Sequence, residues 1–313
     1  MKILFITANR IGDAILSTGL LRHIVAAYPG ARITVACGPL CTDLFDAVPG
    51  LDTVIPMPKQ SWNRHWWTLW RRCAPHSWDM IVDLRNSVVS RLLRHGQLFT
   101  YRTQENRHKV HVNAAIMALD PPPAPQIWVA ESTRNAAANL LAGEGPILAL
   151  GPSANWPAKQ WPAEHFATLA QLLLADPAFE GGRVLVLAAA HEREQIAPVL
   201  RAIPEAQRIE LIGASLALAA ACLQRATLYI GNDSGLMHLA AAVGTPTLGL
   251  FGPGNEAVYG PWGRHAAVAR TPEPATTLLA RLPGPGQPIP SLMTSLEPAI
   301  VREKALDLLK NCQ

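Results

Sequence analysis

Short apolar runs alternate with segments of helical periodicity along this chain, and the alternation occurs twice. The first array opens with KILFIT (2–7), the helical pattern AILSTGLLRHIVAAY (14–28) and a second apolar run, ARITVACG (31–38). The second array opens with GPILALGPS (145–153) and the helical pattern AEHFATLAQLLLAD (163–176). Such alternation favours parallel sheets covered by helices, because a parallel strand pair needs a crossover connection. The sequence therefore predicts an α/β fold with two Rossmann-like domains.

The proline-rich segment DPPPAPQ (120–126) separates the two arrays. Proline fixes φ and lacks an amide hydrogen, which excludes a regular helix or an interior strand there. A length of 313 residues also exceeds what one hydrophobic core usually organises. We expect an N-terminal domain over residues 1–143 and a C-terminal domain over 144–297, with their parallel sheets facing a cleft. The terminal helical pattern, 298–313, is expected to pack back toward the N-terminal domain.

The charge of the chain is uneven. Its formal net charge is +4, yet residues 59–109 alone contain 10 Lys and Arg against 3 Asp and Glu. This imbalance indicates an acidic partner, and nucleic acid, anionic lipid and a phosphorylated sugar all fit on charge alone. The 5 cysteines are scattered without CxxC pairs, which favours a reduced, cytosolic chain without a disulfide framework or a zinc site. The sequence contains no visible signal peptide and no apolar stretch of membrane-spanning length.

The segment GNDSGLMHLAAAVGTPTLGLFGP (231–253) follows the apolar run ATLYI (226–230). A strand that turns into a small-residue helix presents amide groups at the helix N-terminus, where anions bind well. In open α/β sheets, ligands bind beyond the carboxyl ends of the strands. A diphosphate site at this turn is one interpretation. The alternative is structural, because Asp233 or Ser234 can simply cap the helix.

This segment resembles the signature of the ADP-heptose:lipopolysaccharide heptosyltransferase family, a group of inverting glycosyltransferases with the GT-B fold. The similarity continues over nearly the whole chain in the same order. KILFITANRIGDAILSTGLLR (2–22) resembles the opening of the family, and WDMIVDLRNS (78–87) resembles its later N-domain strand. WPAKQWPAEHFATLA (156–170) resembles the start of the second domain, and SLMTSLEPAIV (291–301) resembles the closing segment.

The resemblance implies roles for individual positions. Asp13, preceded by Gly12, would be the general base, and Lys159 would approach the donor diphosphate during catalysis. Glu192 would hold the nucleoside of the donor. The donor-binding set that the resemblance implies is Gly12, Ser153, Lys159, Glu192, Asp233, Ser234, Gly235 and His238.

Some positions depart from the family pattern. Ser234 replaces a threonine but keeps the hydroxyl group, so we expect this change to be tolerated. The family often carries paired Thr or Ser ahead of the lysine, whereas here only Ser153 offers a hydroxyl group, beside Ala154 and Asn155. Ala214 stands where some members have a methionine near the nucleoside. These departures concern the donor contacts and leave the expected fold unchanged.

Cleavage of a sugar–diphosphate bond places negative charge on the leaving nucleotide, which a helix N-terminus, Ser234 and Lys159 are suited to stabilise. The sequence has no DxD element at a metal-holding position, and Asp79 and Asp83 flank an expected buried strand. We therefore expect metal-independent catalysis without a cofactor. Attack on the anomeric carbon needs a base for the acceptor hydroxyl group, and Asp13 at a strand–helix turn fits that role. Its alternative role is to compensate the dipole of the helix.

A Trp- and Arg-rich segment, SWNRHWWTLWRR (61–72), lies in the basic window. Trp62, Trp66 and Trp70 share one face if the segment is helical. One interpretation is an interfacial helix, with Trp at headgroup depth and Arg on anionic lipid or acceptor phosphates. The other is that these Trp side chains pack in the core beneath solvated arginines. The expected acceptor-binding residues are Arg10, Arg64, Arg71, Arg72 and Arg85, and further candidates are Arg91, Arg94, Arg102, Arg107 and Lys109.

The resemblance implies an enzyme that transfers heptose from ADP-heptose to a lipid-anchored inner-core saccharide at the cytoplasmic face of the inner membrane. The residues themselves indicate the anion site, the candidate base and a basic surface suited to an anionic acceptor. One alternative is a related glycosyltransferase with another nucleotide sugar or acceptor. Another is a nucleotide-binding Rossmann protein without transfer activity, which the presence of Asp13 disfavours. A nucleic-acid binder is disfavoured because residues 147–313 are near neutral, with 12 Lys and Arg against 13 Asp and Glu.

Overall fold

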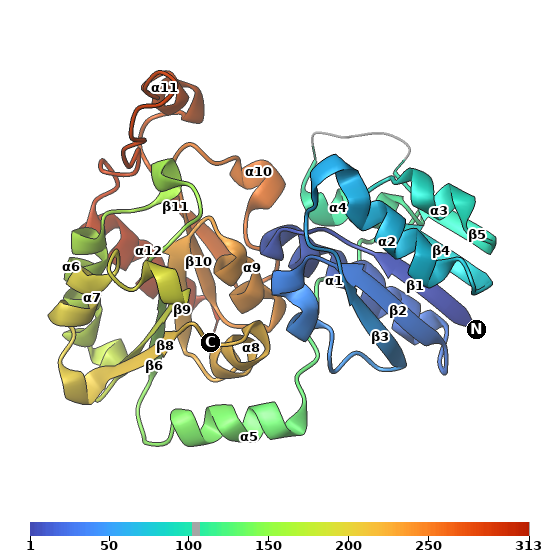
Figure 1. Cartoon of the computed structure of the whole chain (residues 1–313). Coiled ribbons are helices and arrows are strands. Elements are labelled where there is room, and N and C mark those ends of the chain that lie inside the picture. The colour runs from blue at the N-terminus through green and yellow to red at the C-terminus, as the bar shows by residue number, and fades with distance from the viewer. Residues whose placement is uncertain (102–106, 313) are drawn as a thin grey trace. The chain divides into compact units, whose positions relative to one another are not determined.

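The computed structural model describes residues 1–101 and 107–312, and the chain forms two compact units (Figure 1). Unit 1 is Met1–Ala130 and unit 2 is Glu131–Gln313. Each unit contains one parallel β-sheet with helices on both faces, which confirms the expected fold class. The chain over residues 121–130 is neither helix nor strand, as its prolines require.

The sheet of unit 1 has five strands in the order β3-β2-β1-β4-β5. All neighbouring strands pair in parallel. The strands are β1 (Lys2–Ile6), β2 (Arg32–Cys37), β3 (Leu51–Pro56), β4 (Trp78–Asp83) and β5 (His95–Thr100). In the central strand β1, Ile3, Leu4, Phe5 and Ile6 are fully buried. Helices on both faces of the sheet account for this unbroken apolar run.

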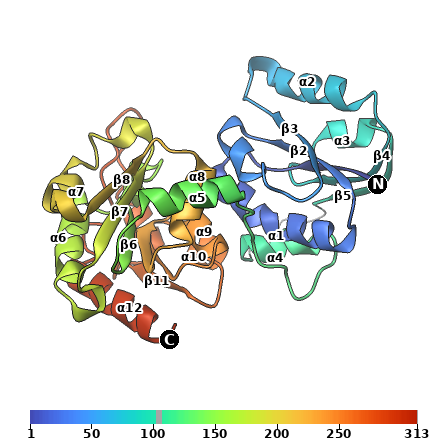
Figure 2. The ribbon, with the colours of Figure 1, turned by 90° about the horizontal axis from the view of Figure 1, so that it is seen from below.

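Two helical layers cover the sheet of unit 1 (Figure 2). The helices are α1 (Ile11–Ala27), α2 (Arg64–Cys73), α3 (Val88–Leu92) and α4 (Lys109–Ala115). α1 and α4 pack together on one face, whereas α2 and α3 pack together on the other. Gly19 of α1 lies against the proline-rich segment, since a Cβ there would stand 2.1 Å from the Pro123 carbonyl oxygen. Glycine at position 19 therefore permits the close approach of the segment to α1.

The sheet of unit 2 has six strands in the order β11-β10-β9-β6-β7-β8, and all neighbours pair in parallel. The strands are β6 (Ile147–Gly151), β7 (Arg183–Ala188), β8 (Arg208–Ile212), β9 (Leu228–Asn232), β10 (Thr247–Phe251) and β11 (Ala266–Arg270). The helices are α5 (Glu131–Leu140), α6 (Ala163–Leu174), α7 (Ala197–Ala202), α8 (Leu216–Leu223), α9 (Gly235–Ala242), α10 (Glu256–Tyr259), α11 (Ala275–Leu279) and α12 (Pro298–Lys310). Among the described residues, no helix combines the length and apolar character that a membrane span requires.

The division of the chain differs from the expected domain boundaries in two respects. Unit 2 begins at Glu131 rather than at residue 144, because α5 packs on α8. The terminal helix α12 was expected to pack toward the N-terminal domain, but it belongs to unit 2. There it packs on α6 and the sheet, with Val301, Ala305 and Leu308 in the core. The apolar spacing of this helix predicts a buried face without specifying which core that face joins.

Candidate functional site

The candidate donor site of unit 2 lies where the winding of the sheet reverses. β6 and β9 are neighbours, and the chain continues from β6 to β7 and β8 on one side and from β9 to β10 and β11 on the other. Open α/β sheets bind ligands at such a point, beyond the carboxyl ends of the strands. Ser153 follows β6, Glu192 follows β7 and Asp233 follows β9. The structure therefore brings these three expected residues to one edge of the sheet.

Asp233 is paired with Lys159 at this edge. The Lys159 Nζ atom lies 2.5 Å from Asp233 Oδ2, and the two side chains are 26% and 7% exposed. Burial raises the pKa of the Asp233 carboxyl group, and the positive charge of Lys159 opposes this shift. The backbone at Gly254 also approaches the carboxylate, because a Cβ there would stand 2.5 Å from Oδ2. The pair places a partly exposed cation beside the turn that follows β9.

Ser153 and Glu192 connect the loops that follow β6 and β7. The Ser153 hydroxyl group donates to Glu192 Oε2 at 2.7 Å, and the Ala189 amide donates to the same oxygen at 2.8 Å. Ser153 itself is buried. These contacts orient the Glu192 carboxylate at the sheet edge. An acidic side chain in such a position is suited to accept hydrogen bonds from ribose hydroxyl groups.

The turn into α9 presents a helix N-terminus without a side-chain cap. Ser234 occupies the N-cap position with an extended backbone, but its hydroxyl group makes no capping hydrogen bond. The neighbouring Asp233 is engaged with Lys159. The capping interpretation of this Asp-Ser pair therefore does not describe the structure. An uncapped helix N-terminus keeps its capacity to bind an anion.

Tyr229 lies beneath this turn, and sequence reasoning missed it. Its side chain is fully buried, and a Cβ on Gly151 or Gly231 would stand 2.0 or 2.2 Å from the hydroxyl oxygen. These glycines face each other on β6 and β9, so they form the slot that admits the ring. Burial raises the pKa of the Tyr229 hydroxyl group, and Ser234 opposes this shift. Neither hydroxyl makes a well-formed hydrogen bond to a residue that the structure describes.

Asn232, the last residue of β9, is a second residue that sequence reasoning missed. Its fully buried side chain donates to the Pro152 carbonyl at 2.9 Å and accepts from the Trp161 amide at 3.0 Å. These bonds fix the loop after β6 against the end of β9. The sequence signal for this role was an amide side chain at the end of an apolar strand. Gly235 and His238 both lie in α9, where His238 is buried.

In unit 1, Asp13 lies in the first turn of α1, one residue after Gly12 and shortly after β1. The side chain is half-buried, and its Oδ1 atom has no hydrogen-bond partner within the described part of the chain. Burial raises the pKa of the carboxyl group, and the positive charges of Lys109 and Arg10 partly offset the rise. A carboxylate with a raised pKa is a better proton acceptor than an exposed one. The position is equally compatible with compensation of the α1 dipole.

Arg85 lies beside the loop that connects β1 to α1. Its Nη1 atom donates to Asn9 Oδ1 at 3.2 Å, and its guanidinium group lies 4.4 Å from the centre of the Trp66 ring. Asp83, fully buried at the end of β4, accepts hydrogen bonds from the Arg85 amide and from the amide and hydroxyl groups of Ser87. These bonds give Asp83 a structural role in the turn. Over residues 1–101 and 107–312, no cluster of three or more His, Cys, Asp or Glu is suited to a metal ion.

The other expected acceptor residues are spread over two elements. Arg10 is exposed immediately before α1, and Arg64 is exposed at the first position of α2. Of the further candidates, Lys109 begins α4 and acts on the pKa of Asp13. Arg102 lies outside the described residues.

Arg71 and Arg72 lie in the last turn of α2. Arg72 lines a cavity of about 210 Å³ together with Lys2 and Arg32. Since Lys2 and Arg32 begin β1 and β2, this cavity lies at the amino ends of the strands. Asp13 lies at the carboxyl end of β1, so the structure places Arg72 and Asp13 at opposite edges of the sheet.

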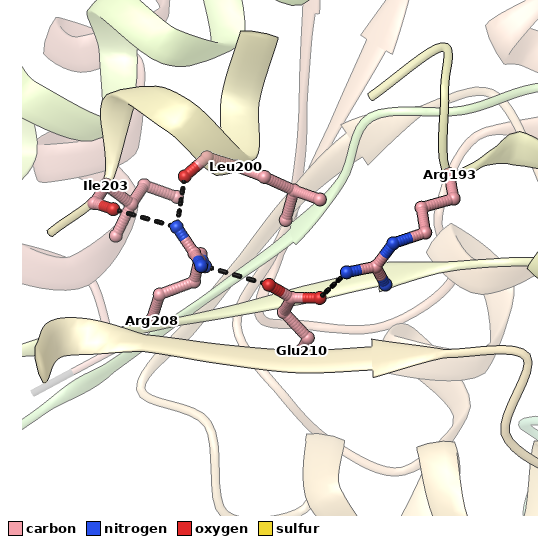
Figure 3. A network of polar contacts seen from close by, with 5 residues as sticks. All are labelled: Arg193, Leu200, Ile203, Arg208 and Glu210. Carbon is pink, nitrogen blue, oxygen red and sulfur yellow. Dashed lines mark hydrogen bonds and ion pairs between the residues drawn. The ribbon is translucent and has the colours of Figure 1, made fainter. Parts of the chain in front are cut away.

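A cavity of about 460 Å³ beside the edge strand β8 contains a structural network. Arg208 donates to the carbonyl oxygens of Leu200 and Ile203 at 2.6 and 3.3 Å, and its Nε atom lies 2.9 Å from Glu210 (Figure 3). Arg193 lies 2.7 Å from the other carboxylate oxygen of Glu210. These hydrogen bonds and ion pairs pair the charged groups with one another and with the carbonyl oxygens at the C-terminal end of α7. None of the expected donor residues lines the cavity.

Comparison with known proteins identifies the family of this chain. Residues 97–281 match the family model described as glycosyltransferase family 9 (heptosyltransferase). Lipopolysaccharide heptosyltransferase 2 of Escherichia coli is 30% identical to this chain, over 86% of this chain and 88% of its own length. The heptosyltransferase 2 of Salmonella typhimurium is 29% identical over the same shares of the two chains.

Solved structures of relatives have the same architecture. The ADP-heptose lps heptosyltransferase II of E. coli superposes with a TM-score of 0.77 at 25% identity and covers 99% of both chains. A family 9 glycosyltransferase from Veillonella parvula superposes with a TM-score of 0.80 at 22% identity, over 99% of this chain and 97% of that chain. The chain belongs to glycosyltransferase family 9, the heptosyltransferase family, and is a glycosyltransferase with the two Rossmann-like units of the GT-B fold.

Proposed function

We propose that this enzyme transfers heptose from ADP-heptose to an inner-core lipopolysaccharide acceptor, with inversion, in one displacement. The observation that carries the proposal is the Lys159–Asp233 pair beside the uncapped N-terminus of α9. It lies at the point of the unit 2 sheet where α/β proteins bind nucleotides. Relatives named lipopolysaccharide heptosyltransferases, similar over 86% of this chain, support the choice of donor and acceptor.

In the donor half of the proposal, α9 and Lys159 bind the diphosphate. The helix N-terminus and the Ser234 hydroxyl group hold the phosphate oxygens, and Lys159 stabilises the charge that develops on the leaving ADP. Glu192, oriented by Ser153 at 2.7 Å, accepts hydrogen bonds from the ribose. An E. coli heptosyltransferase of the same fold, solved with ADP and with ADP-2-deoxy-2-fluoro heptose, supports this choice of nucleotide.

In the acceptor half, Asp13 removes the proton from the attacking hydroxyl group. Its raised pKa and the Oδ1 atom without a hydrogen bond from the described residues fit a general base. Arg10, Arg64 and Arg85 supply positive charge in the same unit for acceptor phosphates. The reaction needs neither a metal ion nor a cofactor in this scheme, because the cationic side chain and the helix N-terminus carry the electrostatic stabilisation.

We further propose that the enzyme acts at the cytoplasmic face of the inner membrane. A lipid-anchored acceptor confines the reaction to a membrane surface. The excess of basic residues in 59–109, 10 against 3, fits an anionic surface of this kind.

The test is transfer from ADP-L-glycero-β-D-manno-heptose to a panel of deacylated inner-core acceptors, with wild type beside Asp13→Asn. Loss of a general base lowers kcat by roughly 10²–10⁴-fold, so turnover on one acceptor should fall by that factor in the variant. ADP binding, measured by calorimetry, should persist in Asp13→Asn and weaken in Lys159→Met. Equal rates in wild type and Asp13→Asn would remove Asp13 as the base.

Failure of transfer to every acceptor would overturn the proposed reaction, and ADP binding then decides what replaces it. Transfer from a different nucleotide sugar would identify a related glycosyltransferase. ADP binding without transfer from any donor would identify a nucleotide-binding protein.

A further inference from the structure

Four exposed apolar side chains lie on the α2–α3 layer of unit 1. Trp62 is 95% exposed, Trp67 60%, Val88 67% and Leu92 66%. Trp62 lies in the turn before α2, Trp67 in α2, and Val88 and Leu92 in α3. α2 packs against α3, so the two helices form one layer, which Figure 2 shows above the sheet. We call this set the α2–α3 surface.

The core of unit 1 does not need these side chains. α2 already contributes a buried face, with His65, Leu69 and Cys73 turned inward. α3 likewise buries Val89 and Ser90. Trp67, on the outward side of α2, stacks on Trp70 with ring centroids 4.8 Å apart. The outward apolar side chains are therefore additional to those that fold the unit.

Trp62 differs from the sequence expectation. It does not share a helical face with Trp66 and Trp70, because it precedes α2 with a left-handed backbone, φ 56°. Trp66 and Trp70 are partly buried against the core. Left-handed conformations are rare for bulky residues. In this turn the Trp62 ring is exposed to solvent.

The charged residues of α2 and α3 themselves have one sign. α2 and α3 contain no acidic residue, and their arginines are Arg64, Arg71, Arg72 and Arg91. Exposed Trp next to Arg is the composition of a surface that rests at lipid headgroups, where the indole ring meets the acyl boundary and the guanidinium groups meet phosphates. A two-fold contact with a second copy would instead bring arginines against arginines, which is unfavourable.

We propose that the α2–α3 surface docks unit 1 on an anionic membrane, with Trp62 and Trp67 as the inserted side chains. This inference deepens the proposed action at a membrane by naming the contact surface. Docking itself does not depend on the identity of the sugar that is transferred. The arginines of α2 lie over headgroup phosphates, and Val88 and Leu92 extend the apolar contact.

The experiment is co-sedimentation of the full chain with vesicles of phosphatidylcholine alone or with added phosphatidylglycerol. Wild type should bind the anionic vesicles, bind neutral vesicles weakly, and dissociate as the ionic strength rises. Trp62→Ser/Trp67→Ser should lower the partition coefficient at least tenfold, since burial of a large aromatic side chain is worth more than that factor. The matched control is Leu279→Ser/Ile300→Ser, two side chains of unit 2 that are 40% and 41% exposed; it should bind as wild type does.

Transfer to a soluble, deacylated acceptor, measured on the same proteins, separates this inference from the proposed reaction. The Trp62→Ser/Trp67→Ser protein should keep that activity and lose activity only on acceptor embedded in vesicles. Absence of wild-type binding to anionic vesicles, or equal binding by the Trp variant, would overturn the docking surface whatever the transfer assay shows. A dimer of the wild type that the Trp variant dissociates, without vesicle binding, would assign the surface to a second copy instead.

Discussion

At the scale of single residues, Asp13 and Asp233 show how surroundings decide what a carboxylate can do. Both follow the carboxyl end of a central strand, and burial raises the pKa of both. Asp233 has Lys159 at 2.5 Å, so its charge is compensated and it holds the cation in place. Asp13 has only more distant compensation by Lys109 and Arg10. The carboxylate without a direct ion pair is the one suited to take a proton.

We predict that Asp13→Asn makes the protein more stable at neutral pH, because burial raises the pKa of the Asp13 carboxyl group. A carboxyl group whose folded pKa is raised binds its proton more tightly when folded. The contribution of this carboxyl group to stability is therefore greatest below its ordinary pKa of 3.8 and is lost as the pH rises through the folded pKa. The amide avoids that loss, so its advantage should shrink as the pH falls toward 3.8.

Thermal unfolding of both proteins over a pH series measures this advantage. Asp79→Asn, at an exposed carboxylate that accepts from the Lys2 amide, is the control for a general effect of charge. A variant less stable than wild type at neutral pH would mean that the α1 dipole and the two cations favour the charged form more than burial disfavours it.

At the scale of elements, the alternating pattern of the sequence predicts the strands β1, β2, β6, β7 and β9 and the placement of donor residues at strand ends. It does not predict the slot for Tyr229, because that slot depends on the pairing of Gly151 with Gly231 from a distant strand. Helical spacing likewise predicts that Trp62 shares a face with Trp66, and this prediction is wrong because α2 begins only at Arg64. Spacing alone does not show at which residue a helix begins. Local periodicity specifies elements, whereas pairing and core choice depend on residues far apart in the chain.

We predict that Gly231→Ala destabilises unit 2 by about 1–3 kcal/mol, the usual cost of overpacking a core. The new Cβ would stand 2.2 Å from the Tyr229 hydroxyl oxygen and 2.9 Å from the Gly151 carbonyl oxygen. In the double variant Gly231→Ala/Tyr229→Val the loss should be smaller than the sum of the single losses, because the ring no longer occupies the slot. Denaturant unfolding of the four proteins gives this coupling.

Gly284→Ala is the matched control, since nothing lies within 4 Å of the position of its new Cβ. If the losses of unfolding free energy in the double variant are additive, the destabilisation by Gly231→Ala comes from the strand backbone and not from a clash with the Tyr229 ring.

At the scale of the whole molecule, the chain has two units, and each has a sheet and a core of its own. The switch point of unit 2, between β6 and β9, carries the cation and the helix N-terminus. The corresponding point of unit 1, between β1 and β4, carries Asp13 and Arg85. A nucleotide bound by unit 2 alone should therefore stabilise one unit directly.

We predict that ADP slows amide hydrogen exchange in unit 2, most of all in the loops after β6, β7 and β9. A ligand at 100 times its Kd stabilises the state that binds it by about 2.7 kcal/mol, which slows exchange through unfolding of that unit by about 100-fold. The strands of unit 1 should exchange at their original rate, and Lys159→Met should reduce the protection in unit 2. Exchange measured peptide by peptide, with and without ADP, separates the units. Equal protection of β1 and β6 would mean that the two sheets unfold as one cooperative body, because a ligand held by one unit protects the other only when both open together.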